Sequence, residues 1–283
     1  RLTKIAKPDT CVITNIGTCH LENLGDRDGV LKAKTEIFQS MKPNGHIVLN
    51  GDDDKLITVR EYNGVKPVFF GLNSERDVYA DQIESKGLKG VACRIHLGED
   101  AFDVLVPTPG IHMVYNALAA AAVGRIYGLT IEEIRRGIES LETIRGRFKM
   151  IETDKFLVVD DCYNANPMSM KASLDVLHDG EGRRVAILGD MGELGEDEAA
   201  LHEGVGIHAA ICGIDACVCV GDLAVHIAEA ARKANPDFPV YYEKTRESLL
   251  EHLNDYVQKG DTILVKASHF MKFEEVVKAL EEM

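Results

Sequence analysis

The spacing of hydrophobic residues along this 283-residue chain predicts alternating strands and helices in its second half. Short apolar runs rich in β-branched residues are typical of buried strands, and apolar residues three or four apart are typical of helices. The expected strands cover 156–160, 184–188, 216–220, 240–242 and 262–266. The expected helices lie near 167–177, 197–211, 223–234 and 246–258, with a last one from Lys272. This alternation predicts right-handed βαβ units and a mostly parallel sheet in an α/β fold.

The first half has a less regular pattern. β-rich runs on either side of Gly98 predict hairpins between 77 and 106. An alanine-rich helix is expected over 111–127, and Thr130 with Glu133 predicts a capping box that opens another helix. The strands expected before the hairpins cover 11–16, 46–49 and 65–71.

The segment 145–148, Arg-Gly-Arg-Phe, separates the two patterns. A helix is expected to end before it, and a strand pair around 149–151 and 156–160 to begin after it. We therefore predict two domains, 1–146 and 147–283, for which the length is sufficient.

Composition narrows the classes of function. Apolar residues make up 45% and charged residues 28%, as in ordinary soluble proteins. The net charge of −14 argues against nucleic-acid binding, and an anionic substrate would need local cations or Mg²⁺. Seven cysteines without a CxxC pair predict reduced thiols in the cytoplasm. The longest apolar run, near 117–123, is too short to cross a membrane.

A lysine occupies an unusual place in the helix expected from about Asp28. Lys34 has the helical spacing of the apolar residues on either side of it, Val30 and Phe38, so it is expected in their buried stripe. A buried ammonium is costly unless it is paired, neutral or modified. The alternative is a side chain long enough to reach the surface.

Polar residues follow several of the expected strands. At the carboxyl edge of the second sheet these are Asp160, Asp161, Asp190, Asp222, Lys266 and Ser268. Ligands of parallel α/β sheets bind at this edge, so a site is expected there. In the first half, the acidic run 50–54 that begins with Asn50 either favours a helix N-terminus or forms the polar edge of a nucleotide pocket.

Two motifs near the start resemble a known family. TNIGxxHLExLG at 14–25 and AKxEIF at 33–38 are similar to the central ATP-binding domain of the Mur ligases, cytoplasmic amino-acid ligases of peptidoglycan synthesis. The resemblance implies that His20 helps to hold Mg²⁺. It also implies that Lys34 carries a carbamate made from CO₂, which supports a second Mg²⁺. Such a carbamate would replace the buried cation by an anion that a metal can pair.

Further motifs extend the resemblance. PGIHMVYN at 109–116 is similar to the family segment beside the adenine, which implies that Asn116 contacts the base. Met113 stands where the family usually has asparagine. The resemblance also makes Arg147 a phosphate-facing residue, a role that suits its planar fork of donors. Without the family, Arg147 is equally well a surface arginine of a linker.

The second half resembles one branch of the family, the ligases that add D-alanyl-D-alanine. DCYNANPMSM at 161–170 matches their DxYNANPxSM signature, and LGDMGELG at 188–195 matches LGDMxELG. The third motif, LVKASH at 264–269, departs from a VKGSR-like pattern at Ala267 and His269. Local chemistry accounts for Asn166 as a helix cap and Pro167 as the first helical residue. The residues that the resemblance places at the ribose or the peptide substrate are Asp161, Tyr163, Asn164, Asn166, Ser169 and Lys266.

The resemblance implies a fold and a reaction. The fold would be the C-terminal part of a P-loop-type ATPase domain followed by a Rossmann-like domain. ATP would phosphorylate the carboxylate of UDP-MurNAc-tripeptide, and the amine of D-alanyl-D-alanine would then attack the acyl phosphate. Two alternatives remain open: a sibling Mur or folylpolyglutamate-type ligase with another amino-acid substrate, and a non-catalytic binding module. A monomer without membrane insertion is expected.

The start of the sequence also carries an expectation. The first residue is Arg1, a buried-type strand follows almost at once, and no GxxxxGK[ST] phosphate loop occurs. We therefore expect part of a longer protein, inactive alone, without the phosphate loop, a metal-binding glutamate and the UDP-sugar-binding domain that the family has upstream.

Overall fold

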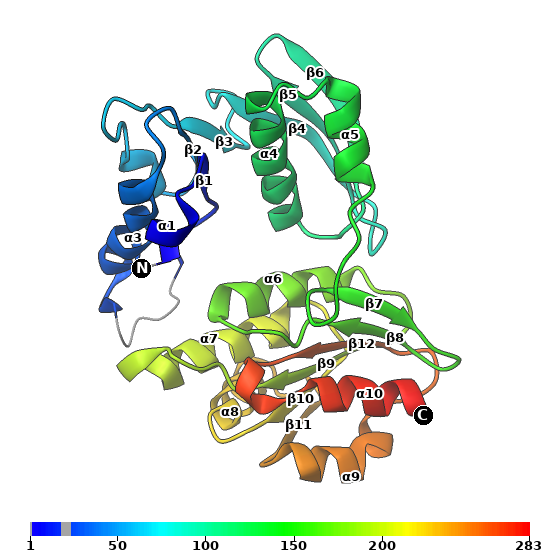
Figure 1. The fold of residues 1–283 in the computed structure, drawn as a ribbon. Coiled ribbons are helices and arrows are strands. Elements are labelled where there is room, and N and C mark those ends of the chain that lie inside the picture. The colour runs from blue at the N-terminus through cyan, green and yellow to red at the C-terminus, as the bar shows by residue number, and fades with distance from the viewer. Residues whose placement is uncertain (1, 18–23) are drawn as a thin grey trace. The chain divides into compact units, whose positions relative to one another are not determined.

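The computed structural model describes residues 2–17 and 24–283. The chain forms two compact units, Arg1–Glu142 and Thr143–Met283, each with its own six-stranded sheet. Figure 1 labels the helices and strands of both units. The α/β class predicted from the hydrophobic pattern is confirmed for each unit.

The sheet of the first unit has the order β1-β2-β3-β4-β5-β6. Its first four strands are parallel, and β4, β5 and β6 pair antiparallel, which confirms the predicted hairpins. The parallel strand β1 is shorter than expected, because the chain leaves the sheet after Ile13. The strand bounds are Thr10–Ile13, His46–Asn50, Val68–Gly71, Val78–Ser85, Val91–Leu97 and Asp100–Val106.

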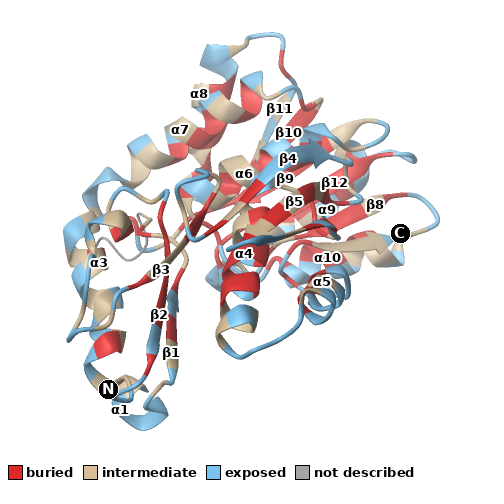
Figure 2. Ribbon diagram, turned by 90° about the horizontal axis from the view of Figure 1, so that it is seen from above, coloured by how far each residue is buried: buried red, intermediate tan, exposed pale blue. Residues whose placement is uncertain are grey.

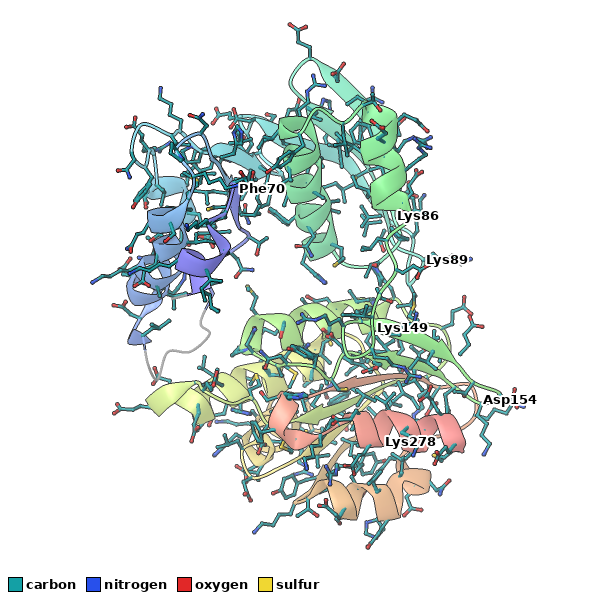
Figure 3. All side chains as sticks on the ribbon, in the orientation of Figure 1. Phe70, Lys86, Lys89, Lys149, Asp154 and Lys278 are labelled. Carbon is teal, nitrogen blue, oxygen red and sulfur yellow. The ribbon has the colours of Figure 1, made fainter. Side chains whose placement is uncertain are left out.

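Two helices after the hairpins cover this sheet. The alanine-rich helix α4 packs on β2 to β6, and α5 packs against β6. Thr130 caps α5 with Glu133 in the predicted capping box. Phe70 of β3 is fully buried in this core, whereas Lys86 and Lys89 lie exposed between β4 and β5 (Figure 3). The α-helix bounds are Leu2–Ala6 (α1), Arg27–Thr35 (α3), Ile111–Ile126 (α4) and Ile131–Glu139 (α5), and the 3₁₀ turns are Glu36–Ser40 and Leu56–Thr58.

The sheet of the second unit has the order β11-β10-β9-β12-β8-β7. All neighbouring pairs are parallel except β7 with β8, and β12 lies between β8 and β9. The carboxyl ends of β8, β9 and β12 therefore meet at one edge. The strand bounds are Lys149–Glu152 (β7), Leu157–Asp160 (β8), Arg184–Gly189 (β9), Ala216–Val220 (β10), Val240–Glu243 (β11) and Thr262–Lys266 (β12).

Helices cover both faces of this second sheet. Helices α6, α7 and α8 pack in succession on one face, and α9 and α10 cover the other (Figure 1). Figure 2 shows the buried residues concentrated along the strands. The helix bounds are Pro167–His178 (α6), Glu198–Ile211 (α7), Ala224–Ala234 (α8), Arg246–Tyr256 (α9) and Glu274–Glu282 (α10), with 3₁₀ turns at Gly195–Asp197 and His269–Met271. Within the described ranges, no helix has the length and apolar character needed to cross a bilayer.

Candidate active site

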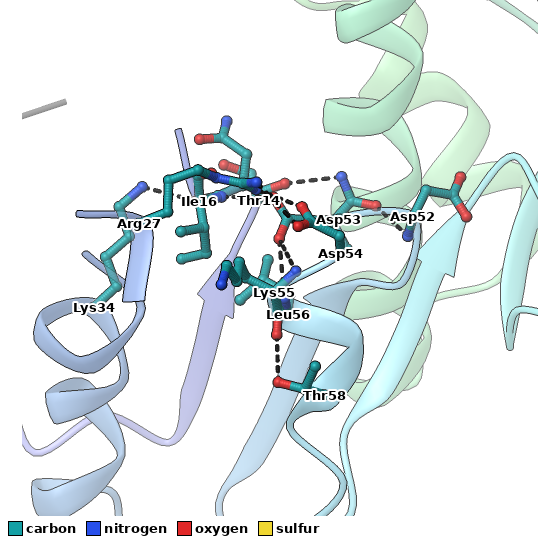
Figure 4. A network of polar contacts seen from close by, with 12 residues as sticks. Thr14, Ile16, Arg27, Lys34, Asp52, Asp53, Asp54, Lys55, Leu56 and Thr58 are labelled. Carbon is teal, nitrogen blue, oxygen red and sulfur yellow. Dashed lines mark hydrogen bonds and ion pairs between the residues drawn. The ribbon is translucent and has the colours of Figure 1, made fainter. Parts of the chain in front are cut away.

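In the first unit, two side chains at and just after the end of β2 hold the segment that follows β1 (Figure 4). The Asn50 amide donates to the carbonyl of Thr14 at 3.0 Å, and the Asp53 carboxylate accepts from the backbone N–H of Ile16 at 2.7 Å. The other oxygen of Asp53 accepts from the N–H of Leu56 at the start of a 3₁₀ turn. The acidic run thus precedes a 3₁₀ turn, Leu56–Thr58, rather than an α-helix, and Asp53 binds the first N–H of that turn. A nucleotide contact of Asn50 stays a prediction.

Arg27, at the start of α3, contacts the same segment after β1. The Arg27 guanidinium donates to the carbonyl of Ile16 at 2.9 Å and to the Asp54 carboxylate at 3.0 Å. The hydrogen bond with Asp54 raises the pKa of Arg27 and lowers the pKa of Asp54. Three short segments therefore meet beyond the carboxyl end of β1.

The prediction that Lys34 lies in a buried stripe is wrong. Val30 is the buried residue of α3, and Lys34 is exposed. Val30 and Lys34 are one turn apart in α3, but the stripe does not continue to Phe38, because α3 ends at Thr35 and a 3₁₀ turn follows. The Lys34 ammonium donates to the carbonyl of Asn15 at 2.8 Å, so it does point to the segment after β1 (Figure 4).

The predicted metal site cannot be completed from the described residues. His20 lies outside them. Within residues 2–17 and 24–283, no group of three His, Cys, Asp or Glu side chains could hold a metal ion. The carbamate on Lys34 and the Mg²⁺ ions stay predictions.

The segment predicted to border adenine begins α4. Asn116 is exposed, and its amide lies 3.4 Å from the sulfur of Met113, which packs against the core. Between them, the Tyr115 hydroxyl donates to Asp52 at 3.2 Å, and burial followed by the Asp52 charge raises the pKa of Tyr115 to about 12. This bond joins α4 to the loop that follows Asn50. The two predicted nucleotide contacts of the first unit are thus carried by connected segments.

In the second unit, an ion pair joins the buried Lys266, the last residue of β12, to the partly buried Asp161 in the loop after β8. Lys266 is 3% exposed, and its ammonium donates to the Asp161 carboxylate at 2.5 Å and to the carbonyl of Asn164 at 3.1 Å. The same carboxylate accepts from the Ser173 hydroxyl at 2.7 Å and from the N–H of Phe148 at 3.1 Å. Losing one partner of such a pair typically costs about 3–5 kcal/mol. The resemblance places Asp161 at the ribose and Lys266 at the peptide substrate, but in the structure the two side chains form an ion pair with each other.

Ser268, after β12, connects the loop after β9 to the loop after β8. Its hydroxyl accepts from the N–H of Gly192 at 2.9 Å and donates to the carbonyl of Ala165 at 3.4 Å, and its N–H donates to the carbonyl of Asp190. Ala267, one of the departures from the family pattern, packs against Gly189, where a Cβ would come within 2.7 Å. The three sequence motifs of the second unit therefore form one connected group of loops.

Sequence reasoning missed His202, which supports these loops. The fully buried imidazole accepts from the N–H of Met191 at 2.9 Å and lies 2.6 Å from the carbonyl of Glu198. Burial lowers the pKa of His202, so the ring is neutral and Nδ1 donates to Glu198. No motif marks this position; its signal is a lone histidine on the face of a helix.

The loop that begins with Tyr163 combines structural and exposed residues. Asn166 and Ser169 form a capping box on α6, which confirms the capping interpretation. Asn164 is exposed, and its side-chain oxygen accepts from the N–H of Ala165. Tyr163 is 48% exposed and has the Arg147 guanidinium over its ring. Substrate contacts of these residues stay predictions.

A hollow of about 390 Å³ lies at the carboxyl ends of β9, β10 and β11. Asp190 is one of the lining residues and accepts from the N–H groups of Leu223 and Ala224 at the start of α8; burial raises the pKa of Asp190. Acids and bases both line the hollow, which suits a ligand that carries both charges. The charged residues are Asp190, Asp222, Lys244, Arg246, Glu247 and Lys272.

Comparison with known proteins identifies the family. The model of the Mur ligase middle domain matches residues 1–124, and the model of the Mur ligase glutamate ligase domain matches residues 146–269. The chain belongs to the Mur ligase family. This Mur ligase chain is 36% identical, over 99% of its length, to the UDP-N-acetylmuramoyl-tripeptide–D-alanyl-D-alanine ligase of Bacillus subtilis (strain 168). It spans 61% of the length of that relative.

Solved structures agree with this placement. The Mur ligase chain matches MurF from Acinetobacter baumannii with a TM-score of 0.89 at 32% identity, over 99% of this chain and 61% of that one. It matches MurF from Thermotoga maritima, solved in complex with ADP, with a TM-score of 0.84 at 28% identity, over 99% of this chain and 63% of that one. The predicted α/β fold, a Mur ligase central domain followed by a Rossmann-like C-terminal domain, is thus confirmed for the Mur ligase chain.

Proposed function

We propose that this protein joins D-alanyl-D-alanine to UDP-MurNAc-tripeptide in the cytoplasm, with ATP as the co-substrate, during peptidoglycan synthesis. The observation that carries the proposal is the connected group of loops in the second unit. All three motifs that resemble the D-alanyl-D-alanine-adding branch meet there, joined by Lys266 and Ser268. Similarity to two D-alanyl-D-alanine-adding ligases, over 98% or more of the chain, supports it.

The nucleotide contacts that we propose are those predicted from the family motifs. We assign Asn116 and Asn50 to the base side and Asp161 to the ribose, and Arg147 to a phosphate that its guanidinium can bind through two N–H groups. Among residues 2–17 and 24–283, no three potential ligands come together as a metal site. When bound by His20 and a carbamylated Lys34, Mg²⁺ would neutralise phosphate charge.

The dipeptide would bind at the carboxyl edge of the second sheet. It has an ammonium at one end and a carboxylate at the other, so its site must offer both charges or their hydrogen-bonding equivalents. We assign it to the exposed side of the Tyr163–Asn166 loop, where Asn164 offers a donor and an acceptor. Lys266 and Ser169 would then act by holding this loop in place. The hollow beside Lys244 is the alternative location.

The test is a ligation assay on the full-length protein. Release of phosphate from ATP should require both UDP-MurNAc-tripeptide and D-alanyl-D-alanine, and mass spectrometry should find the pentapeptide product. Activity with a single amino acid but not with the dipeptide would favour a sibling ligase. Binding of the UDP-linked peptide without any ATP-dependent product would favour a non-catalytic module.

A further inference from the structure

Arg147 lies between two residues with left-handed backbone conformations. Gly146 has φ +76° and Phe148 has φ +54°. A Cβ at Gly146 would lie 3.0 Å from the Cβ of Tyr163, so the chain passes close to this tyrosine. The side chain of Phe148 is buried, which fixes the chain on the other side of Arg147.

Hydrogen bonds fix the same segment to the second unit. The N–H of Gly146 donates to the Asp160 carboxylate at 2.9 Å, and its carbonyl accepts from the N–H of Tyr163 at 2.9 Å. The N–H of Phe148 donates to the Asp161 carboxylate at 3.1 Å. The backbone of Arg147 is thus held on both sides, and the direction of its side chain is set by the second unit.

The side chain of Arg147 ends over an aromatic ring. Its guanidinium carbon lies 4.1 Å from the centroid of the Tyr163 ring, and the His269 ring lies 5.5 Å from the same ring. Among the described residues, no carboxylate pairs with Arg147, which is exposed. Its neighbour Arg145 is different, because both of its terminal nitrogens donate to Glu281 at 2.9 Å.

An aromatic ring can hold a guanidinium while the N–H groups of the guanidinium stay available as donors. The attraction comes from the π face of the ring, whereas a carboxylate would occupy the N–H groups that a second anion needs. An arginine held in this way is already oriented, so less conformational freedom is lost when an anion binds.

We propose that Tyr163 is a positioning residue whose ring holds Arg147 ready for a phosphate group of the substrates. This deepens the proposed function, on which its link to ligation rests. It also assigns Tyr163 a role other than the predicted contact with the dipeptide, which then falls to Asn164.

The first test measures the geometry in the 283-residue chain and is independent of activity. In chain labelled with ¹⁵N-arginine, the Nε–H resonance of Arg147 should show a ring-current shift. Tyr163→Phe should keep the shift, and Tyr163→Leu should remove it. Tyr241→Leu is the matched control, because Tyr241 is exposed and packs against Tyr256 instead. An Arg147 resonance unchanged in Tyr163→Leu would overturn the proposal.

The second test asks whether the oriented arginine binds phosphate. Titration with inorganic pyrophosphate should shift the Arg147 resonance and leave that of Arg145 in place. The apparent affinity should fall about two- to fivefold in Tyr163→Leu, the range of an exposed cation–π contact, and stay unchanged in Tyr163→Phe. Equal affinities of the native chain, Tyr163→Leu and Tyr163→Phe, or no response of Arg147, would show that Tyr163 does not hold Arg147 for phosphate binding, against the proposal.

The third test separates positioning from direct binding in the full-length enzyme. Tyr163→Leu should raise the KM of a phosphate-bearing substrate and not that of the dipeptide, and it should add nothing in an Arg147→Ala background. Effects that multiply in the double variant would show that Tyr163 acts on its own, against the proposal. An enzyme without ligation would refute the proposed function, while the two spectroscopic tests would still decide the role of Tyr163.

Discussion

At the scale of single residues, the loop after β9 depends on the protonation state of one imidazole. His202 accepts from Met191 and donates to Glu198, which requires a neutral ring with its proton on Nδ1. A protonated ring has no acceptor, so it would leave the Met191 N–H facing a donor. The ring is fully buried, so no solvent can replace the lost bond.

Acidification should therefore destabilise the second unit through His202. Burial lowers the pKa of this group in the folded state, whereas the unfolded chain titrates near the ordinary histidine pKa of about 6.5. Below about pH 6.5 the unfolded state then binds more protons than the folded state. The stability that neutral His202 contributes is therefore complete above that pH and is lost as the pH falls. Melting temperatures of the native chain and of His202→Gln, measured between pH 5 and 8, should differ most at the alkaline end. A difference that is constant across this range would contradict the argument.

Lys34 carries a second prediction at this scale. Its ammonium donates to the carbonyl of Asn15, in the segment that follows β1. The family motif around Lys34 implies a carbamate that supports a metal. In the full-length enzyme, Lys34→Ala should abolish ligation, and a short-chain carboxylic acid should restore part of it by supplying the missing anion. Normal activity of Lys34→Ala would rule the carbamate out. In the chain described here we expect an unmodified lysine, which the intact mass would show.

At the scale of elements, the correct predictions came mostly from local sequence patterns. The capping boxes at Thr130 and Asn166 were predictable because their partners lie three residues apart. The stripe containing Lys34 was not, because a change from α-helix to 3₁₀ turn leaves no mark in the hydrophobic spacing. The pairing of Lys266 with Asp161 was also missed, since the two residues are brought together by the insertion of β12 beside β8. Motifs located the site, but contacts distant in sequence decide which residues are free to act in it.

The loop after β8 and the hollow after β11 make different predictions for dipeptide binding. Asn164→Ala removes a side chain that offers a donor and an acceptor, each worth about 1–3 kcal/mol if left unpaired in a closed site. In the full-length enzyme we expect it to raise the KM of the dipeptide about tenfold or less, because the residue is exposed here, and to leave the KM of ATP nearly unchanged. Lys244→Met, at the mouth of the hollow, is the matched variant and should leave both constants unchanged. The reverse result would place the dipeptide in the hollow, and a rise in the KM of ATP would assign Asn164 to the nucleotide.

At the scale of the whole molecule, each unit has its own hydrophobic core. Two buried clusters of the first unit lie within residues 11–138, and a buried cluster of the second lies within 156–280. Between α5 and the anchored segment 146–148, residues 141–144 have no helix or strand, and Leu141, Glu142 and Ile144 are exposed. We infer that the boundary lies in this stretch rather than at the predicted position between Gly146 and Arg147, because 146–148 is hydrogen-bonded to the second unit.

Limited proteolysis should locate this boundary. A protease needs a stretch of chain that can leave its surroundings, and 141–144 meets this condition better than the segment after it, where Gly146 and Phe148 are bound on both sides of Arg147. Trypsin should cut the native chain slowly after Arg145, which is paired with Glu281, and after Arg147. Glu142→Lys, which introduces a trypsin site upstream of these bonds, should be cut rapidly there. The two products should remain folded by circular dichroism, because each retains its own core. If the native chain is cut after Arg145 or Arg147 as fast as Glu142→Lys is cut at its new site, the anchored segment is not fixed to the second unit. The boundary would then lie where the sequence pattern placed it.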